Sequence, residues 1–246
     1  MNTSFLINQA VLLTLLFSIY YASGKLVLNK GVKVNYTRKI NHFALFFLPH
    51  LLNMVLVFQK STLTITISLG IAIMTLGLFI EPLRQRSSVL RTIFLSFDRP
   101  EDRPHTLLWL TTQYIAAAAV IIPLGMGFAA MQKAELVFIP ILINGLGDGL
   151  AEPVGVRFGR IKYSTRALFS DKRYERSLEG SLCVFLAGLL CIIAFRHSFT
   201  PVQFIAALAA IPIAATLAEA FSPHTWDTPF IFGVTGVSCI CILTFL

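Results

Sequence analysis

The chain has 246 residues, of which 56% are hydrophobic and 13% are charged, and its mean hydropathy is +0.75. Soluble domains are much less apolar, so this composition excludes an ordinary soluble globular protein and indicates a membrane protein. The formal net charge of +8 does not indicate nucleic-acid binding, because the basic residues flank apolar segments; anionic lipid headgroups or a phosphorylated small molecule are the expected partners.

Apolar stretches long enough to cross a hydrocarbon core about 30 Å thick recur along the whole chain. In chain order we expect eight spans, at residues 4–22, 40–58, 62–82, 107–125, 136–153, 178–195, 201–221 and 229–246. The predicted fold is therefore an all-α polytopic bundle of about eight transmembrane helices, forming one membrane domain over residues 1–246. We interpret the first stretch as a retained helix, since it lacks the basic region of a secretory signal.

The distribution of Lys and Arg predicts which side of the membrane each loop faces. Seventeen of the 20 basic residues fall in alternate loops, at residues 23–39, 83–106 and 154–177, and only Lys60, Lys133 and Arg196 fall in the others. Cytoplasmic loops of membrane proteins carry an excess of Lys and Arg. We therefore expect a multi-pass protein with both termini outside and the polar site described below facing the cytoplasm.

The loop at residues 83–106 contains two features. Val89, Leu90, Ile93, Phe94 and Phe97 are spaced to form one face of a short helix, which we expect to lie at the membrane surface. The charged cluster that follows, at residues 98–105, is typical of a solvated turn.

The fifth apolar stretch runs into "NGLGDGLAEPVGVRFGR", residues 144–160. If this segment is helical, Asn144, Asp148 and Glu152 are four residues apart and share one face. Because an unpaired carboxylate at membrane depth costs several kcal/mol, such groups normally face a protein interior, a cavity or a cation. The stripe therefore indicates a functional site.

The glycines of this segment have two interpretations. Gly145, Gly147, Gly149, Gly155 and Gly159 can expose backbone N–H groups to an anion, or they can allow two helices to approach closely. The spacing alone does not decide between them.

The basic loop that follows favours phosphate chemistry, since phosphoryl transfer needs carboxylates for Mg²⁺ and cations for phosphate oxygens. The loop contains Arg157 and ends in "RYERSLEGS", where Ser177 can cap the next helix and leave N–H groups for an anion. Glu219 and Asp227 follow near the next cytoplasmic turn.

A basic pair, Arg38 and Lys39, precedes the second span, and His42 lies one turn inside it. Such a pair is equally typical of membrane topology and of a phosphate contact.

Four segments, "TRKINH", "GDGLAEPVGVRFG", "SLEGS" and "AEAFSPHTWDTP", resemble in that order the membrane kinases that phosphorylate lipid alcohols with CTP. This group comprises dolichol kinase, phytol and farnesol kinase, and yeast-type diacylglycerol kinase, and the resemblance covers about residues 36–230. It implies transfer of the γ-phosphate of CTP, or of another nucleoside triphosphate, to a lipid hydroxyl at the cytoplasmic face, with Mg²⁺ or another divalent cation. The chain departs from the group at Arg176, where lysine is frequent, and at Thr228, where asparagine is frequent.

The resemblance also implies roles for individual residues. For catalysis it indicates Asp148, Arg38, Lys39, Glu179 and Glu219; for nucleotide or phosphate binding, Gly147, Gly149, Gly155, Arg157, Gly159, Arg176, Ser177, Gly180 and Ser181; for the metal, Asp148, Glu152 and Asp227; and as further polar residues His42 and Asn144.

Three other functions stay open at this point. We favour an isoprenoid alcohol as the acceptor, but diacylglycerol is an alternative. The acids can line the path of an ion-coupled transporter, or the enzyme can be a cytidylyltransferase that makes a CDP-lipid and attacks the α-phosphate of CTP.

Overall fold

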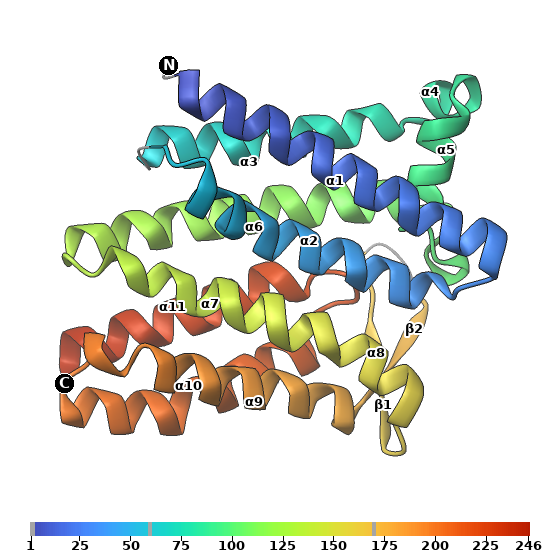
Figure 1. The fold of residues 1–246 in the computed structure, drawn as a ribbon. Coiled ribbons are helices and arrows are strands. Elements are labelled where there is room, and N and C mark those ends of the chain that lie inside the picture. The colour runs from blue at the N-terminus through green and yellow to red at the C-terminus, as the bar shows by residue number, and fades with distance from the viewer. Residues whose placement is uncertain (1–2, 59–60, 169–170) are drawn as a thin grey trace. The chain divides into compact units, whose positions relative to one another are not determined.

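The computed structural model describes residues 3–58, 61–168 and 171–246, so Lys60 lies outside the described residues (Figure 1). The chain divides into two compact units, Met1–Tyr114 and Ile115–Leu246, each described here by itself. Helices make up almost all of the regular structure in both.

The first unit consists of helices and short helical turns. They are α1 (Thr3–Lys30), α2 (Val34–Val55), α3 (Thr62–Leu76), η1 (Gly77–Phe79), α4 (Glu81–Arg86), α5 (Ser88–Leu95), η2 (Pro100–Asp102) and the first part of α6 (Thr106–Ala130).

Helix α5 confirms the short helix expected between the third and fourth spans. Ile93 and Phe94 are 1% and 5% exposed, and they pack with Leu16 and Tyr20 of α1 in the core of the first unit. These two side chains therefore pack against α1 and η1, and the position of α5 at the membrane surface stays a prediction.

The second unit contains the rest of α6, then a continuous helical run and a helical bundle with a hairpin. Its elements are η3 (Ala134–Val137), α7 (Phe138–Leu142), η4 (Ile143–Asp148), α8 (Gly149–Phe158), β1 (Lys162–Arg166), β2 (Arg173–Ser177), α9 (Leu178–Ala194), η5 (Arg196–Ser198), α10 (Pro201–Phe221) and α11 (Asp227–Phe245).

Five helices in the described part of the chain are long and apolar enough to cross a membrane. They are Thr3–Lys30, Thr106–Ala130, Ala134–Phe158, Pro201–Phe221 and Asp227–Phe245, which match the first, fourth, fifth, seventh and eighth expected spans. The third and sixth correspond to the shorter apolar helices Leu63–Phe79 and Leu178–Ala194, and the second overlaps α2, which ends at Val55. The fold is that of an all-α membrane protein, and the eight-span topology stays a prediction.

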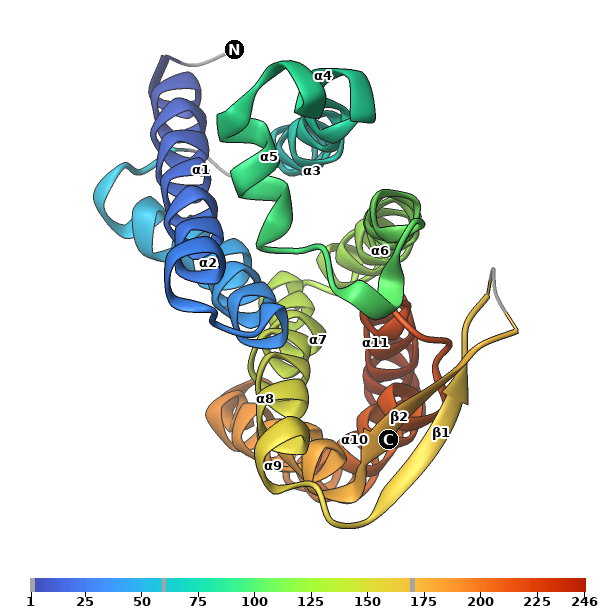
Figure 2. The same cartoon turned by 90° about the vertical axis from the view of Figure 1, so that its right-hand side faces the viewer.

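Part of the basic loop expected at residues 154–177 is ordered as regular structure. Helix α8 continues through Pro153 to Phe158, and β1 and β2 then form an antiparallel hairpin in which Lys162 pairs with Ser177 and Thr165 with Tyr174. Tyr163 and Thr165 alternate with exposed polar neighbours, as expected for a strand with one covered face. The hairpin runs across one end of the bundle formed by the second unit (Figure 2).

Glycine allows α9 and α10 to approach closely within this bundle. A Cβ atom added to Gly188 of α9 would lie 2.8 Å from Pro212 Cα of α10, and neither backbone can yield easily. The two helices therefore depend on a missing side chain at this crossing.

We expect Gly188→Ala to lower the free energy of unfolding by about 1–3 kcal/mol through overpacking. Gly127→Ala is the matched control in the same unit, because its Cβ would lie 3.5 Å from Ile240 Cδ1, an ordinary contact. The control should be neutral or stabilising by about 0.5–1 kcal/mol. Thermal unfolding in detergent measures both, and equal unfolding temperatures would contradict the close crossing.

Candidate functional site

A buried ion-pair network connects the hairpin to the turn between α10 and α11. Arg176 of β2 donates from Nη1 to Glu219 Oε1 at 2.9 Å and also to the Glu219 carbonyl oxygen. Its Nη2 donates to Asp227 Oδ1 and, at 3.2 Å, to Ser222 Oγ. One guanidinium thus binds two carboxylates that come from different helices, and we call these four residues the Arg176 cluster.

The charges of the Arg176 cluster are largely removed from water. The side chains of Arg176, Glu219 and Asp227 are 12%, 6% and 16% exposed. Burial opposes the charged form of Arg176, but the carboxylates of Asp227 and Glu219 outweigh it and raise the pKa of the guanidinium above its ordinary value. Arg176 therefore stays a cation at every pH at which the protein is folded.

Two hydroxyl groups extend the network from the other side. Ser181 of α9 donates to Glu219 Oε2 at 2.8 Å, and the Tyr163 hydroxyl lies 2.6 Å from Ser181 Oγ. Since the single Ser181 proton goes to Glu219, Tyr163 is the donor to Ser181. Burial and the nearby Glu219 raise the pKa of Tyr163, so it keeps the proton that this bond needs.

The hairpin is fastened to the same turn by a stacked ring pair. The rings of Tyr174 and His224 are nearly parallel with centroids 3.5 Å apart, and the His224 amide donates to the Arg166 carbonyl at 2.8 Å. The turn between α10 and α11 is therefore held by strand contacts as well as by ions.

Asn144 and Asp148 lie in η4, a π-helical turn between two α-helical segments. They are 0% and 7% exposed, and Asn144 Nδ2 donates to Thr228 Oγ1 of α11 at 3.3 Å. Glu152, one turn further, is only half-buried. The expected polar stripe thus faces the protein interior at Asn144 and Asp148. Single π turns inside helices occur frequently at functional sites.

The glycines of this segment serve close helix packing, the second of the two interpretations. Added Cβ atoms at Gly147, Gly155 and Gly180 would lie 2.7–2.8 Å from Val184 Cα, Ser177 Oγ and the Ala151 carbonyl, respectively. At Gly159 the added atom would lie 2.4 Å from the Gly155 carbonyl and 2.8 Å from Ser177 Cβ. Gly149 is buried at the start of α8. The backbone of α8 thereby contacts the start of α9 directly.

Ser177 caps α9 as expected, because its side chain accepts from the Gly180 amide at 3.1 Å. The expectation that the start of α9 leaves N–H groups for an anion is not supported, because the Leu178 amide donates to the Ile161 carbonyl at 2.9 Å. Glu179 Oε1 accepts from the Arg160 amide at 2.9 Å and from the Ile161 amide at 3.4 Å. The start of α9 therefore holds the end of α8 and does not present a row of free donors.

A hollow of about 480 Å³ opens beside these contacts and is lined by Arg157, Phe158, Gly159, Arg160 and Glu179. Arg157 and Arg160 are exposed there, so two guanidinium groups are available to an anion from solution. Arg160 is not among the site residues that the resemblance implies. The feature of the sequence that points to it is the high density of basic residues in this loop.

Arg38, Lys39 and His42 belong to the first unit. Arg38 Nη1 lies 3.5 Å from Asp102 Oδ2, which also accepts from Arg99 Nε at 2.7 Å. Lys39 is buried, and the His42 ring packs 4.6 Å from that of Phe46. Asp102 and Arg99 are 3% and 7% exposed, so the interpretation of residues 98–105 as a solvated turn is wrong for these two side chains, whereas residues 100, 101 and 103–105 are exposed as expected.

Within residues 3–58, 61–168 and 171–246, no group of three His, Cys, Asp or Glu side chains is placed to hold a metal ion. Of the acids expected at a metal, Asp227 is bound by Arg176, while Asp148 lies buried in η4. Proteins often hold Mg²⁺ by one or two carboxylates together with substrate phosphates. A single carboxylate such as that of Asp148 is compatible with this mode of binding, and the metal stays a prediction.

Comparison with protein-family models, with curated proteins and with solved structures found no match.

We expect Arg176→Gln to destabilise the protein by about 3 kcal/mol, because it leaves the carboxylates of Glu219 and Asp227 buried without their cation. Lys162→Gln is the control in the same hairpin: Lys162 pairs with Glu175 at 2.8 Å, but both side chains are more than half exposed. Thermal unfolding in detergent compares the two variants.

Combining Arg176→Gln with Glu219→Gln and Asp227→Asn should recover part of the loss, since the isolated buried charges are removed. A triple variant no more stable than Arg176→Gln, or a loss as large for Lys162→Gln, would contradict this account of the cluster.

Proposed function

We propose that this protein is a membrane phosphotransferase that moves the γ-phosphoryl group of CTP to the hydroxyl of a membrane isoprenoid alcohol. The observation that carries the proposal is the convergence of three segments, at residues 144–160, 173–181 and 219–228, on neighbouring positions of the second unit. Asn144 bonds Thr228, Arg176 bonds Glu219 and Asp227, and Ser181 bonds Glu219. These three segments correspond to three of the four that carry the resemblance to the CTP-dependent lipid kinases; the fourth, "TRKINH", lies in the first unit.

Exposed and buried cations have different roles in the proposal. Arg157 and Arg160 line an open hollow and suit the triphosphate of a nucleotide arriving from water. Arg176 is committed to Glu219 and Asp227, so we assign it to positioning these carboxylates and not to direct phosphate contact. Glu179 likewise positions the backbone at Arg160.

The reaction forms one bond and breaks one. The lipid hydroxyl oxygen bonds to the γ-phosphorus, the bond from that phosphorus to the β–γ bridging oxygen breaks, and CDP leaves. The hydroxyl proton passes to a carboxylate of the Arg176 cluster and then to solvent. Mg²⁺, when bound with Asp148 and the phosphates, would supply charge neutralisation for the transferring group.

Asp148→Asn should abolish transfer while leaving the unfolding temperature close to that of the wild type. Asp171→Asn, the same change at an exposed aspartate, should keep normal activity. The measurement uses purified protein in lipid, Mg²⁺, and CTP or ATP labelled at the γ-phosphate, with a panel of isoprenoid alcohols and diacylglycerol as acceptors.

The position of the label separates the competing functions. In a parallel reaction with CTP labelled at the α-phosphate, label entering the lipid would indicate a cytidylyltransferase. In the γ-labelled reaction, label in diacylglycerol alone would change the acceptor. Near-normal turnover by Asp148→Asn, or no label in any acceptor, would reject the proposal; the second result would favour the transporter.

Arg157→Gln and Arg160→Gln should each raise the KM for CTP about tenfold or more, since each removes a charged hydrogen bond to phosphate. Arg196→Gln is the control: this exposed arginine lies in η5, beyond the opposite end of α9. A KM raised equally in all three variants would show that the hollow is not the nucleotide site.

A further inference from the structure

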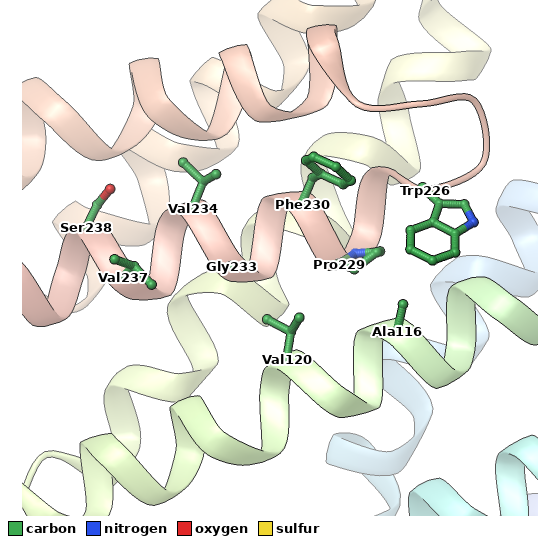
Figure 3. A pocket seen from close by; sticks show the side chains of 9 residues that line it. All are labelled: Ala116, Val120, Trp226, Pro229, Phe230, Gly233, Val234, Val237 and Ser238. Atoms are coloured by element: carbon green, nitrogen blue, oxygen red, sulfur yellow. The ribbon is translucent and has the colours of Figure 1, made fainter. Parts of the chain in front are cut away.

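An apolar groove runs between α6 and α11 in the second unit (Figure 3). Its volume is about 560 Å³, and every residue that lines it belongs to these two helices or to Trp226, which directly precedes α11. Ala116 and Val120 of α6 form one wall, and Pro229, Gly233 and Val237 lie along the other. The lining from Pro229 to Ser238 extends over about 14 Å of helix.

The surroundings of the groove limit what can occupy it. Both walls are helices long and apolar enough to cross a membrane, so the occupant that suits this lining is a hydrocarbon chain. Its floor is low at Gly233, where an added Cβ would meet only Val120 Cγ1, at 3.7 Å.

The groove ends beside the Arg176 cluster. Trp226 stands at one end of it, and the next residue is Asp227, whose Oδ1 accepts from Arg176 and from Ser222 Oγ. An amphiphile whose chain fills the groove with its polar end toward Trp226 would place that end near Asp227. Its opposite end reaches Ser238, well inside the predicted span.

We infer that this groove binds the hydrocarbon chain of the acceptor alcohol and selects a single-chain isoprenoid alcohol by the length of chain that it covers. The inference rests on the proposed function, because it takes the chain to be that of the phosphate acceptor. Longer alcohols should be better substrates until the groove is filled, after which further length adds nothing.

The test is Gly233→Leu, which fills the middle of the groove. Displacing about two methylene groups from apolar surroundings is worth about tenfold in affinity, so kcat/KM for long alcohols should fall at least tenfold. Short alcohols that do not reach Gly233 should be unaffected. Gly127→Leu is the matched control on α6, outside the groove and similarly half-buried; it should keep the wild-type dependence on chain length.

A second readout does not need catalysis. A long-chain isoprenoid alcohol with a diazirine near its hydrocarbon end, in phospholipid nanodiscs, should cross-link to peptides of α6 and α11. Unlabelled alcohol should compete with this cross-link, and it should be lost in Gly233→Leu and kept in Gly127→Leu.

The two readouts separate failure of the groove from failure of the function. Active enzyme with an unchanged chain-length profile in Gly233→Leu, or cross-linking elsewhere, overturns the groove alone. A cross-link that unlabelled alcohol does not reduce also overturns the groove inference, and it shows that bulk phospholipid fills the groove. A competed cross-link in a protein that transfers no phosphate supports the groove and rejects the kinase.

Discussion

The ion pairs of Arg176 are the constraint on which the second unit depends. Two buried carboxylates, from α10 and α11, are tolerable in an apolar bundle only because one guanidinium bonds both of them. That guanidinium is carried by β2, so the hairpin has to lie across the bundle end to deliver it. The stacking of Tyr174 on His224 fixes the hairpin in the same position, and the helix ends and the hairpin therefore form one unit.

The close contact of α8 with α9 also determines where polar groups lie. Because Gly155 and Gly159 lack side chains, Ser177 can lie against the α8 backbone and still cap α9. This contact brings Ser181 within reach of Glu219 and lets Glu179 hold the Arg160 amide. Small residues in one segment thus determine where the charged residues of the next segment point.

Local features of the sequence predicted local features of the fold. Hydropathy is summed over consecutive residues, so it identified the five long apolar helices, and a serine before "LEGS" identified the cap of α9. The hairpin and the ion pairs escaped prediction because strand pairing and charge pairing depend on distant residues: Arg176 bonds carboxylates 43 and 51 positions away. The glycines of residues 144–160 were equally compatible with anion binding and with close helix packing. The position of Ser177 beside Gly155 and Gly159 decides between the two, and no local sequence pattern predicts that position.

The arrangement of the second unit also suits a reaction between a water-soluble anion and a membrane alcohol. Such a reaction has to take place where hydrocarbon ends, since a triphosphate cannot enter the bilayer and a long chain cannot leave it cheaply. In the proposed function, the exposed arginines at the end of α8 and the apolar groove along α11 serve as the two approaches. The buried cation of the Arg176 cluster can hold two carboxylates ready for the hydroxyl without itself competing for the phosphate. For this reason the proposal gives Arg176, whose hydrogen bonds hold two carboxylates, no contact with substrate. It gives the contacts with the nucleotide to the exposed Arg157 and Arg160.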